Sequence, residues 1–138
     1  MNEKFYVSLE AARLLKEKGY DRECVAYYQH GTFYPYAINT QRELSITNKN
    51  ATPAYMEQYS APTKAEAIDW LESKGIVITV DVYYIMHEED DCCTSCWGYY
   101  IRKDDEVVCK DYSSDYKARL EAEEVAIIKA LKLLKNKN

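Results

Sequence analysis

The side chains best suited to chemistry in this chain are gathered in one short acidic segment. Cys93 and Cys96 have the Cys-x-x-Cys spacing that can bring two thiolates to one zinc ion, and His87 and Cys92 could supply further ligands. A structural zinc site needs four ligands and usually takes them from two separate pairs. All of these candidates come from a single stretch of chain, so zinc binding here would need a tight local loop.

One distant thiol could in principle complete such a site. A predicted hairpin places Cys109 opposite Tyr100, which is about four residues along the strand from Cys96. At about 3.3 Å per residue, that separation is too long for two ligands of the same ion. The local set is therefore the only candidate metal site.

The same cysteine spacing also occurs in thiol–disulfide redox proteins, where a helix N-terminus lowers the thiol pKa. In this chain, Cys93 and Cys96 are predicted to lie in a loop between strands. Nearby carboxylates should raise the thiol pKa there. These acids are Glu88, Glu89, Asp90 and Asp91. The favoured interpretation is ordinary loop thiols, with a small metal-binding or redox protein as the alternative.

Other catalytic arrangements are missing from the sequence. The four glycines are too widely separated for a dinucleotide fingerprint or a phosphate-binding loop. Only two histidines are present, His30 and His87. No nucleophile, general base and orienting residue can be combined from what remains. We therefore predict a non-enzymatic protein that has no catalytic or cofactor-binding residues.

The composition excludes several classes of partner. The net charge of -5 disfavours a nucleic-acid backbone, because such binders concentrate Lys and Arg on one face. No apolar run is long enough for a signal peptide or a membrane span, so a cytoplasmic protein without membrane contact is expected. The 138 residues suit a single domain, with an N-terminal part over 1–59 and a C-terminal part over 60–138.

The elements that must position these residues follow from caps and hydrophobic periodicity. Ser8 is a predicted N-cap for a helix over 9–18, and Thr63 with Glu66 forms a predicted capping box for a helix over 64–74. A long final helix is predicted over 115–135. Strands are predicted over 24–29, 33–38, 43–47, 76–86, 97–103 and 106–110, with a turn at 104–105.

This order predicts an α+β fold, α-β(β)-α-β-β-β-α, with a mainly antiparallel sheet and helices packed on one face. Alternate residues from Ile76 to Met86 are all apolar, so one whole face of that strand is expected to be buried. The final helix is expected to pack across the whole sheet. The predicted core comprises Ile68, Trp70, Leu71, Ile78, Val80, Val82, Leu120, Ile127 and Leu131.

The chain has 14 tyrosines but only 2 Phe and 2 Trp, which points to contact surfaces as well as to half-buried strands. Tyrosine gives contact area at low entropic cost, and an acidic patch can steer a basic partner. The predicted interaction surface comprises Tyr34, Tyr36, Tyr55, Tyr59, Glu88, Glu89, Asp90 and Asp91. A protein partner or a homo-oligomer is the expected assembly.

Two segments carry a resemblance to a known family. They are 8–20 with Cys24, Tyr27 and Tyr28, and 60–72 with 76–82 and the 112–134 ending. Together they resemble a family of uncharacterised small proteins from prophages and mobile elements of gut bacteria. The resemblance implies a phage or mobile-element protein of the bacterial cytoplasm, and it carries over no functional residues.

The order helix, three strands, helix is also similar to the double-stranded-RNA-binding domain and to related antitoxins that bind proteins. The RNA-binding version needs a basic start to its last helix. Here that helix is expected to start at Asp115, and the loop after the first strand carries the acids Glu88 and Glu89. These charges would repel RNA, so RNA binding is not expected, and the order of elements alone does not transfer a function.

Overall fold

The computed structural model describes residues 3–38, 41, 44–89 and 92–135. Within these residues, helices and antiparallel strands form the α+β fold that the sequence predicts. The helices are α1 (Leu9–Glu17), α2 (Lys64–Ser73) and α3 (Arg119–Leu133), with 3₁₀ turns η1 (Glu3–Phe5), η2 (Lys49–Ala51) and η3 (Ala54–Met56). The strands are β1 (Tyr27–Gln29), β2 (Thr32–Tyr34), β3 (Ala37–Ile38), β4 (Leu44–Ser45), β5 (Gln58–Ser60), β6 (Ile76–His87), β7 (Cys92–Lys103) and β8 (Glu106–Tyr116).

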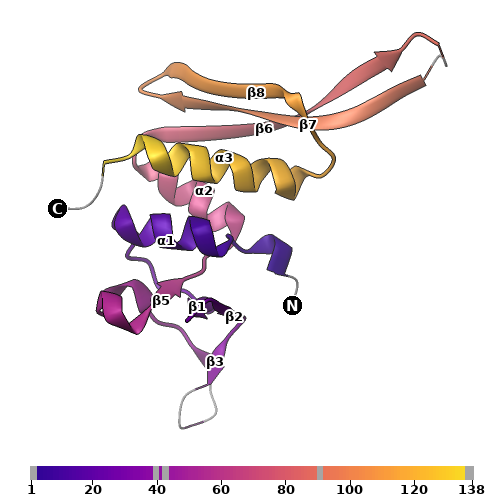
Figure 1. The fold of residues 1–138 in the computed structure, drawn as a ribbon. Coiled ribbons are helices and arrows are strands. Elements are labelled where there is room, and N and C mark those ends of the chain that lie inside the picture. Colours follow the sequence, from indigo (N-terminus) through magenta and orange to yellow (C-terminus); the bar gives the residue numbers. More distant parts are fainter. Residues whose placement is uncertain (1–2, 39–40, 42–43, 90–91, 136–138) are drawn as a thin grey trace.

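The elements are stacked in layers (Figure 1). The largest sheet has the strand order β6-β7-β8, and α2 and α3 pack on one of its faces. Helix α1 packs against α3 from the other side, and the small sheet β2-β1-β5 lies beyond α1. The C-terminal part of the chain therefore makes the large sheet with its covering helices, and the N-terminal part is built onto those helices.

Both predicted N-caps are confirmed. The Ser8 hydroxyl accepts a hydrogen bond from the Ala11 amide at 3.2 Å, where α1 begins. At α2 the Thr63 hydroxyl accepts from the Glu66 amide at 3.1 Å, and the Glu66 carboxylate accepts from the Thr63 amide at 3.0 Å. These bonds satisfy amide donors that have no partner within the helix, which is why the local sequence sets the start of each helix.

The predicted turn between β7 and β8 is also confirmed. Asp104 and Asp105 have φ values of 53° and 66°, the left-handed conformation that a tight two-residue hairpin requires at both central positions. The predicted register differs by one residue, since Cys109 lies opposite Ile101 and not Tyr100. A register shift between Ile101 and Arg102 explains the difference, because a bulge adds a residue to one strand only.

Several predicted boundaries are wrong. The segment expected to be a cysteine-containing loop is the first half of β7, which begins at Cys92 and not at Trp97. Strand β8 continues to Tyr116, so α3 begins at Arg119 and not at Asp115. In both cases a neighbouring strand supplies backbone hydrogen bonds that local sequence patterns do not reveal.

The N-terminal part also differs from the prediction. The strands expected over 24–29 and 43–47 are shorter, and the one expected over 33–38 is two strands, β2 and β3, which belong to different sheets. Strand β5 is not among the predicted strands.

The predicted core is largely confirmed. Most of its members are buried or half-buried: Ile68, Trp70, Leu71, Ile78, Val80, Leu120, Ile127 and Leu131. Val82 is the exception, because 40% of it is exposed. The 15 residues of α3 span about 22 Å, whereas the 12 residues of β6 span about 40 Å. The helix contacts all three strands, as expected, but it covers only part of their length and leaves one end of the sheet uncovered.

Candidate functional site

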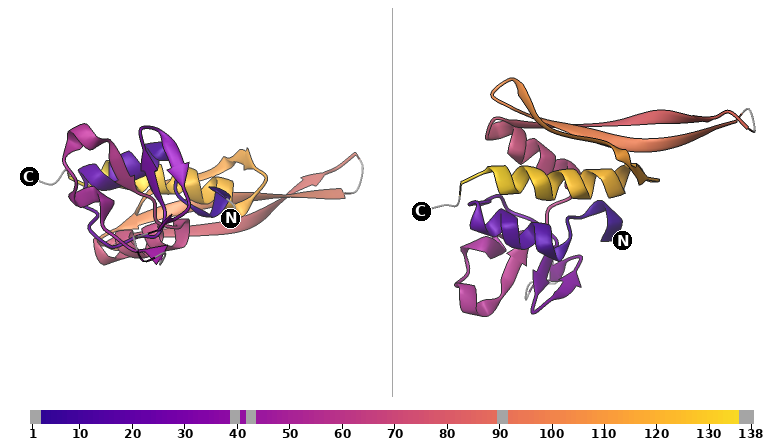
Figure 2. Two further views of the ribbon diagram at one scale, coloured as in Figure 1. Left: turned by 90° about the horizontal axis from the view of Figure 1, so that it is seen from below. Right: turned by 45° about the horizontal axis from the view of Figure 1, so that its top comes forward.

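The uncovered part of the large sheet is a two-stranded projection, which we call the β6–β7 arm and define as residues 82–87 and 92–97. Figure 2 shows it extending well beyond the helices. Strand β8 accompanies β7 only as far as the pair Trp97 and Tyr116, so the arm consists of β6 and β7 alone. An isolated two-stranded ribbon is only marginally stable in water, so the length of this arm needs a structural or functional explanation.

The arm carries large apolar side chains in contact with solvent. Val82 is 40% exposed, and Tyr84 and Met86 are each 66% exposed. These residues continue the alternation that begins at Ile76 and Ile78, which are buried on the same face beneath the helices. Contiguous exposed apolar side chains are typical of interaction sites on soluble proteins.

On the face of the sheet opposite to Val82, Tyr84 and Met86, side-chain contacts hold the base of the arm in place. The rings of Tyr83 and Tyr112 meet edge to face at 5.7 Å between centroids. The Tyr112 hydroxyl donates to the Asp81 carboxylate at 3.4 Å. That carboxylate and burial both raise the pKa of Tyr112, burial being the larger cause. Cys96 lies opposite Tyr83 and is only 3% exposed. The arm is therefore a firmly rooted extension of the sheet.

The structure separates the predicted zinc ligands along one strand. Cys93 and Cys96 are three residues apart on β7, so their Cα atoms are about 10 Å apart and fall on opposite faces of the sheet. The backbones of His87 and Cys92 face each other as the last pair of the hairpin. The side chains of His87, Cys92 and Cys93 lie outside the described part of the structure. Among the side chains that are described, no group of three or more His, Cys, Asp or Glu could hold a metal ion.

The predicted interaction residues do not form one surface. Glu88 and Glu89 are exposed at the end of the arm, whereas Asp90 and Asp91 lie outside the described residues. The predicted tyrosines lie on or beside β2, β3, η3 and β5, on the far side of the molecule (Figure 1). Tyr34, Tyr36 and Tyr55 are exposed, and Tyr55 reaches 82%. The acidic and the tyrosine-rich parts could thus not contact one small partner together.

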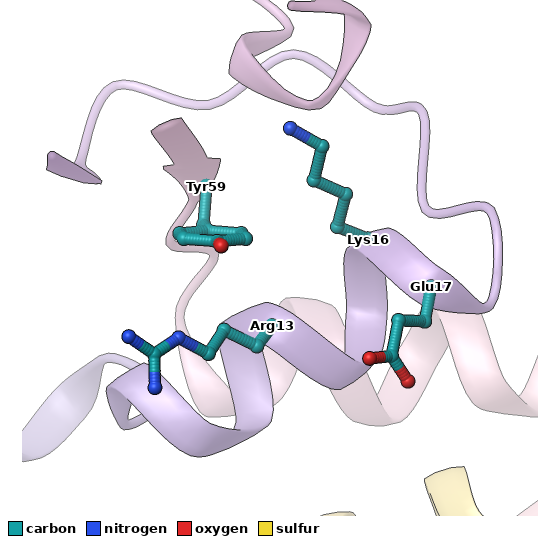
Figure 3. Close-up of a pocket in the computed structure, with 4 residues that line it drawn as sticks. All are labelled: Arg13, Lys16, Glu17 and Tyr59. Carbon is teal, nitrogen blue, oxygen red and sulfur yellow. The ribbon is translucent and has the colours of Figure 1, made fainter. Parts of the chain in front are cut away.

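Tyr59 is half-buried and lines a small pocket together with residues of α1 (Figure 3). Arg13, Lys16, Glu17 and Tyr59 line this pocket of about 260 Å³. The Lys16 ammonium donates to the carbonyls of Thr52 and Gln58 at 3.2 and 3.1 Å, and it lies 5.2 Å from the centre of the Tyr59 ring. Burial lowers the pKa of Lys16.

These contacts tie α1 to η2 and β5, which is a structural task. The Arg13 guanidinium lies 5.7 Å from the Tyr59 ring centre, so the ring is flanked by two cations. Among the described lining residues, Lys16 has the lowered pKa that an amine nucleophile needs, but its ammonium already donates to two carbonyls. These contacts give Lys16 a structural role.

A second cluster joins η1, α2 and α3. Lys64 is 7% exposed, and its ammonium donates to the Lys4 carbonyl at 2.6 Å and lies 3.9 Å from the Glu124 carboxylate. The other oxygen of Glu124 accepts from the Ser8 amide at 3.0 Å. This buried pair was missed in the sequence, because a lysine and a glutamate on two amphipathic helices normally lie on the wet face.

Comparisons with protein families, with curated proteins and with solved structures find no match to this chain. Among the described residues, no helix combines the length and the apolar character that crossing a membrane requires. The structure establishes the fold class, but a fold does not imply a function, and the surfaces of the molecule are what bear on its function.

Proposed function

We propose that this protein is a non-enzymatic protein-interaction module of phage or mobile-element origin, and that the β6–β7 arm is its contact surface. The observation that carries the proposal is the exposure of Val82, Tyr84 and Met86 on a sheet extension that the helices do not reach. The proposed origin is supported by the family resemblance of the sequence alone.

Two properties of the arm support a role in binding. Tyr84 and Met86 are side chains that protein interfaces favour, since one offers a rigid amphipathic ring and the other an adaptable thioether. The exposed acids Glu88 and Glu89 follow directly at the end of the arm, where they can attract a basic partner from a distance. Apolar contact area bordered by charge is the usual composition of a specific interface.

The alternative of a thiol or metal protein has less support. Cys96 is buried against the neighbouring strand, which protects it from redox partners and from oxidants. Cys93 is separated from it along β7, so the pair lacks the compact geometry that Cys-x-x-Cys has at the start of a helix. Nothing in the described surroundings of Cys96 favours this function over binding.

The proposal is tested by removing the apolar side chains of the arm. The double variant Tyr84→Ser/Met86→Ser should lose association in solution, both with itself and with proteins retained from a bacterial lysate. Tyr55→Ser is the control, because Tyr55 is 82% exposed, more than Tyr84 and Met86 at 66%, but lies in η3, away from the arm. Circular dichroism should show that both variants stay folded. Equal retention by the arm variant and the control would refute the arm as the contact surface.

A further inference from the structure

Strand β6 is an open edge of the large sheet. The strand order is β6-β7-β8, so within the described residues β6 pairs with β7 alone. The pairing runs without a register shift from Ile76 to His87, and Asp81 is the single acidic residue in that run. Proteins normally protect edge strands with bulges, prolines or repeated charges. Strand β6 has no proline and no bulge, and therefore remains a template for pairing.

The other edge of the same sheet is protected. Strand β8 shifts register twice against β7, between Trp97 and Tyr99 and between Ile101 and Arg102. Bulges of this kind twist an edge and interrupt its row of hydrogen-bonding groups. One edge is thus blocked, while the other is long, regular and apolar. This asymmetry points to use of the β6 edge.

We propose that the partner of the arm is a second copy of this chain, and that the two copies pair through antiparallel β6 strands about a two-fold axis at Val82. This inference rests on the proposed function, because it names the partner of the same surface. The pairing is self-complementary: each copy offers the same strand, and the sheet continues through both copies as six strands. Backbone groups along the edge of β6 that faces no other described strand would pair with the β6 strand of the second copy.

The apolar residues on the helix-covered face of the sheet explain why the two-fold axis is placed at Val82. In this register Tyr84 and Met86 of one copy lie opposite Val80 and Ile78 of the other, so apolar residues meet apolar residues. Antiparallel edge pairing also keeps both helical layers on the same face of the joined sheet. Each exposed arm then lies beside the α2 layer of the other copy, which covers β6. An edge strand alone buries less than the roughly 800 Å² per partner of a stable interface, so this apolar face must contribute.

Charge supports the same register. Glu88 and Glu89 at the end of one arm come to lie beside the start of β6 in the other copy, where Lys74 is exposed. Lys103, the last residue of β7, pairs with Ile76 at the same end. Asp104 also lies close to Gly75, so the start of β6 carries charges of both signs. Lys74 and Lys103 nevertheless border the start of the strand directly. In this register Asp81 faces Tyr83 of the other copy. Centring the axis at Asp81 would place two carboxylates opposite each other.

The proposal is tested by the mass of the full chain in sedimentation equilibrium. The wild type should sediment at twice the 16.1 kDa of one chain. Val82→Lys sets two ammonium groups against each other at the axis and should weaken self-association at least tenfold. Val108→Lys is the matched control on β8, since Val108 is 46% exposed and Val82 40%. It should sediment as the wild type does. A monomeric wild type at 100 µM, or a dimeric Val82→Lys variant, would overturn the proposal.

A second measurement tests the register. Dimers mixed from ¹⁴N- and ¹⁵N-labelled chains are treated with a carbodiimide, which joins lysine to a carboxylate in direct contact. Mass spectrometry should find Lys74 of one copy joined to Glu88 or Glu89 of the other. A dimer without this mixed-label product would overturn the pairing about Val82. If the wild type is monomeric but Tyr84→Ser/Met86→Ser still loses a lysate protein, self-pairing fails while the proposed function stands.

Discussion

The ring of Tyr112 lies directly over Gly98. A Cβ atom at Gly98 would stand 2.9 Å from Cε1 of Tyr112 and 2.8 Å from the main-chain oxygen of Asp111. At this point β8 leaves its regular pairing, since Tyr99 faces Asp111 but Trp97 faces Tyr116. The extra residues of β8 bulge across the sheet where the arm begins. Glycine is therefore required because another strand approaches its backbone closely.

The first prediction is that Gly98→Ala destabilises the protein by about 1–3 kcal/mol, the usual cost of overpacking. Chemical denaturation measures the free energy of unfolding. The same change in a Tyr112→Ala background should cost less, because the ring is gone and only the clash with the Asp111 carbonyl remains. Equal costs in both backgrounds would show that the ring does not constrain this position.

The second prediction concerns the buried pair between α2 and α3. Lys64→Met removes the ammonium near the Glu124 carboxylate, one oxygen of which has no hydrogen-bond partner in the part of the chain that the structure describes. Leaving this partly buried carboxylate without its counter-charge should cost about 1–3 kcal/mol of unfolding free energy. Adding Glu124→Gln should recover part of this loss, since a neutral amide oxygen still accepts from the Ser8 amide. Denaturation of the four chains gives the coupling, and simple additivity would contradict the pairing.

The third prediction is a loss of stability at alkaline pH. Burial raises the pKa of the Cys24 thiol to about 11 from its usual 9.0. Between these values the unfolded thiol ionises while the folded thiol keeps its proton, so the folded state binds more protons and stability falls as pH rises. Burial likewise raises the pKa of Tyr28 to about 12, which extends the loss upward.

Thermal unfolding between pH 8 and pH 11 measures this effect. The midpoint should fall across the range, with Cys24 contributing on the order of 2 kcal/mol. Cys24→Ala should start from a lower stability, because the side chain is buried, but its curve should fall less steeply. Curves of the same slope for the wild type and Cys24→Ala would show that this thiol does not cause the loss.

The fourth prediction is that the chain binds no stoichiometric zinc. Protein purified without chelators should contain far less than one zinc per chain by elemental analysis, because Cys93 and Cys96 are spread along a strand. A thiol reagent should modify Cys96 slowly in the folded state, as the residue is 3% exposed. If the wild type carried one zinc per chain and Cys96→Ala carried none, a metal-binding function would be favoured over the proposed protein-interaction function.

Local signals determined much of this fold. The caps at Ser8 and Thr63 and the turn at Asp104 and Asp105 each satisfy backbone groups within a few residues, so their residue types alone predict them. The alternation of apolar residues predicts strand β6, because successive side chains of a strand point to opposite faces. The predicted α+β class follows from the order of these elements.

Tertiary structure alone decided which of these residues form a surface. Ile78 and Val82 occupy equivalent positions in one apolar pattern, yet Ile78 is buried and Val82 is 40% exposed. Periodicity reports which side of a strand is apolar, but burial depends on how far the covering helix reaches along it. In the same way, Gly98 and Lys64 owe their roles to segments distant in sequence. The start of helix α3 lies short of the end of β6, and the strand that extends past it forms the arm.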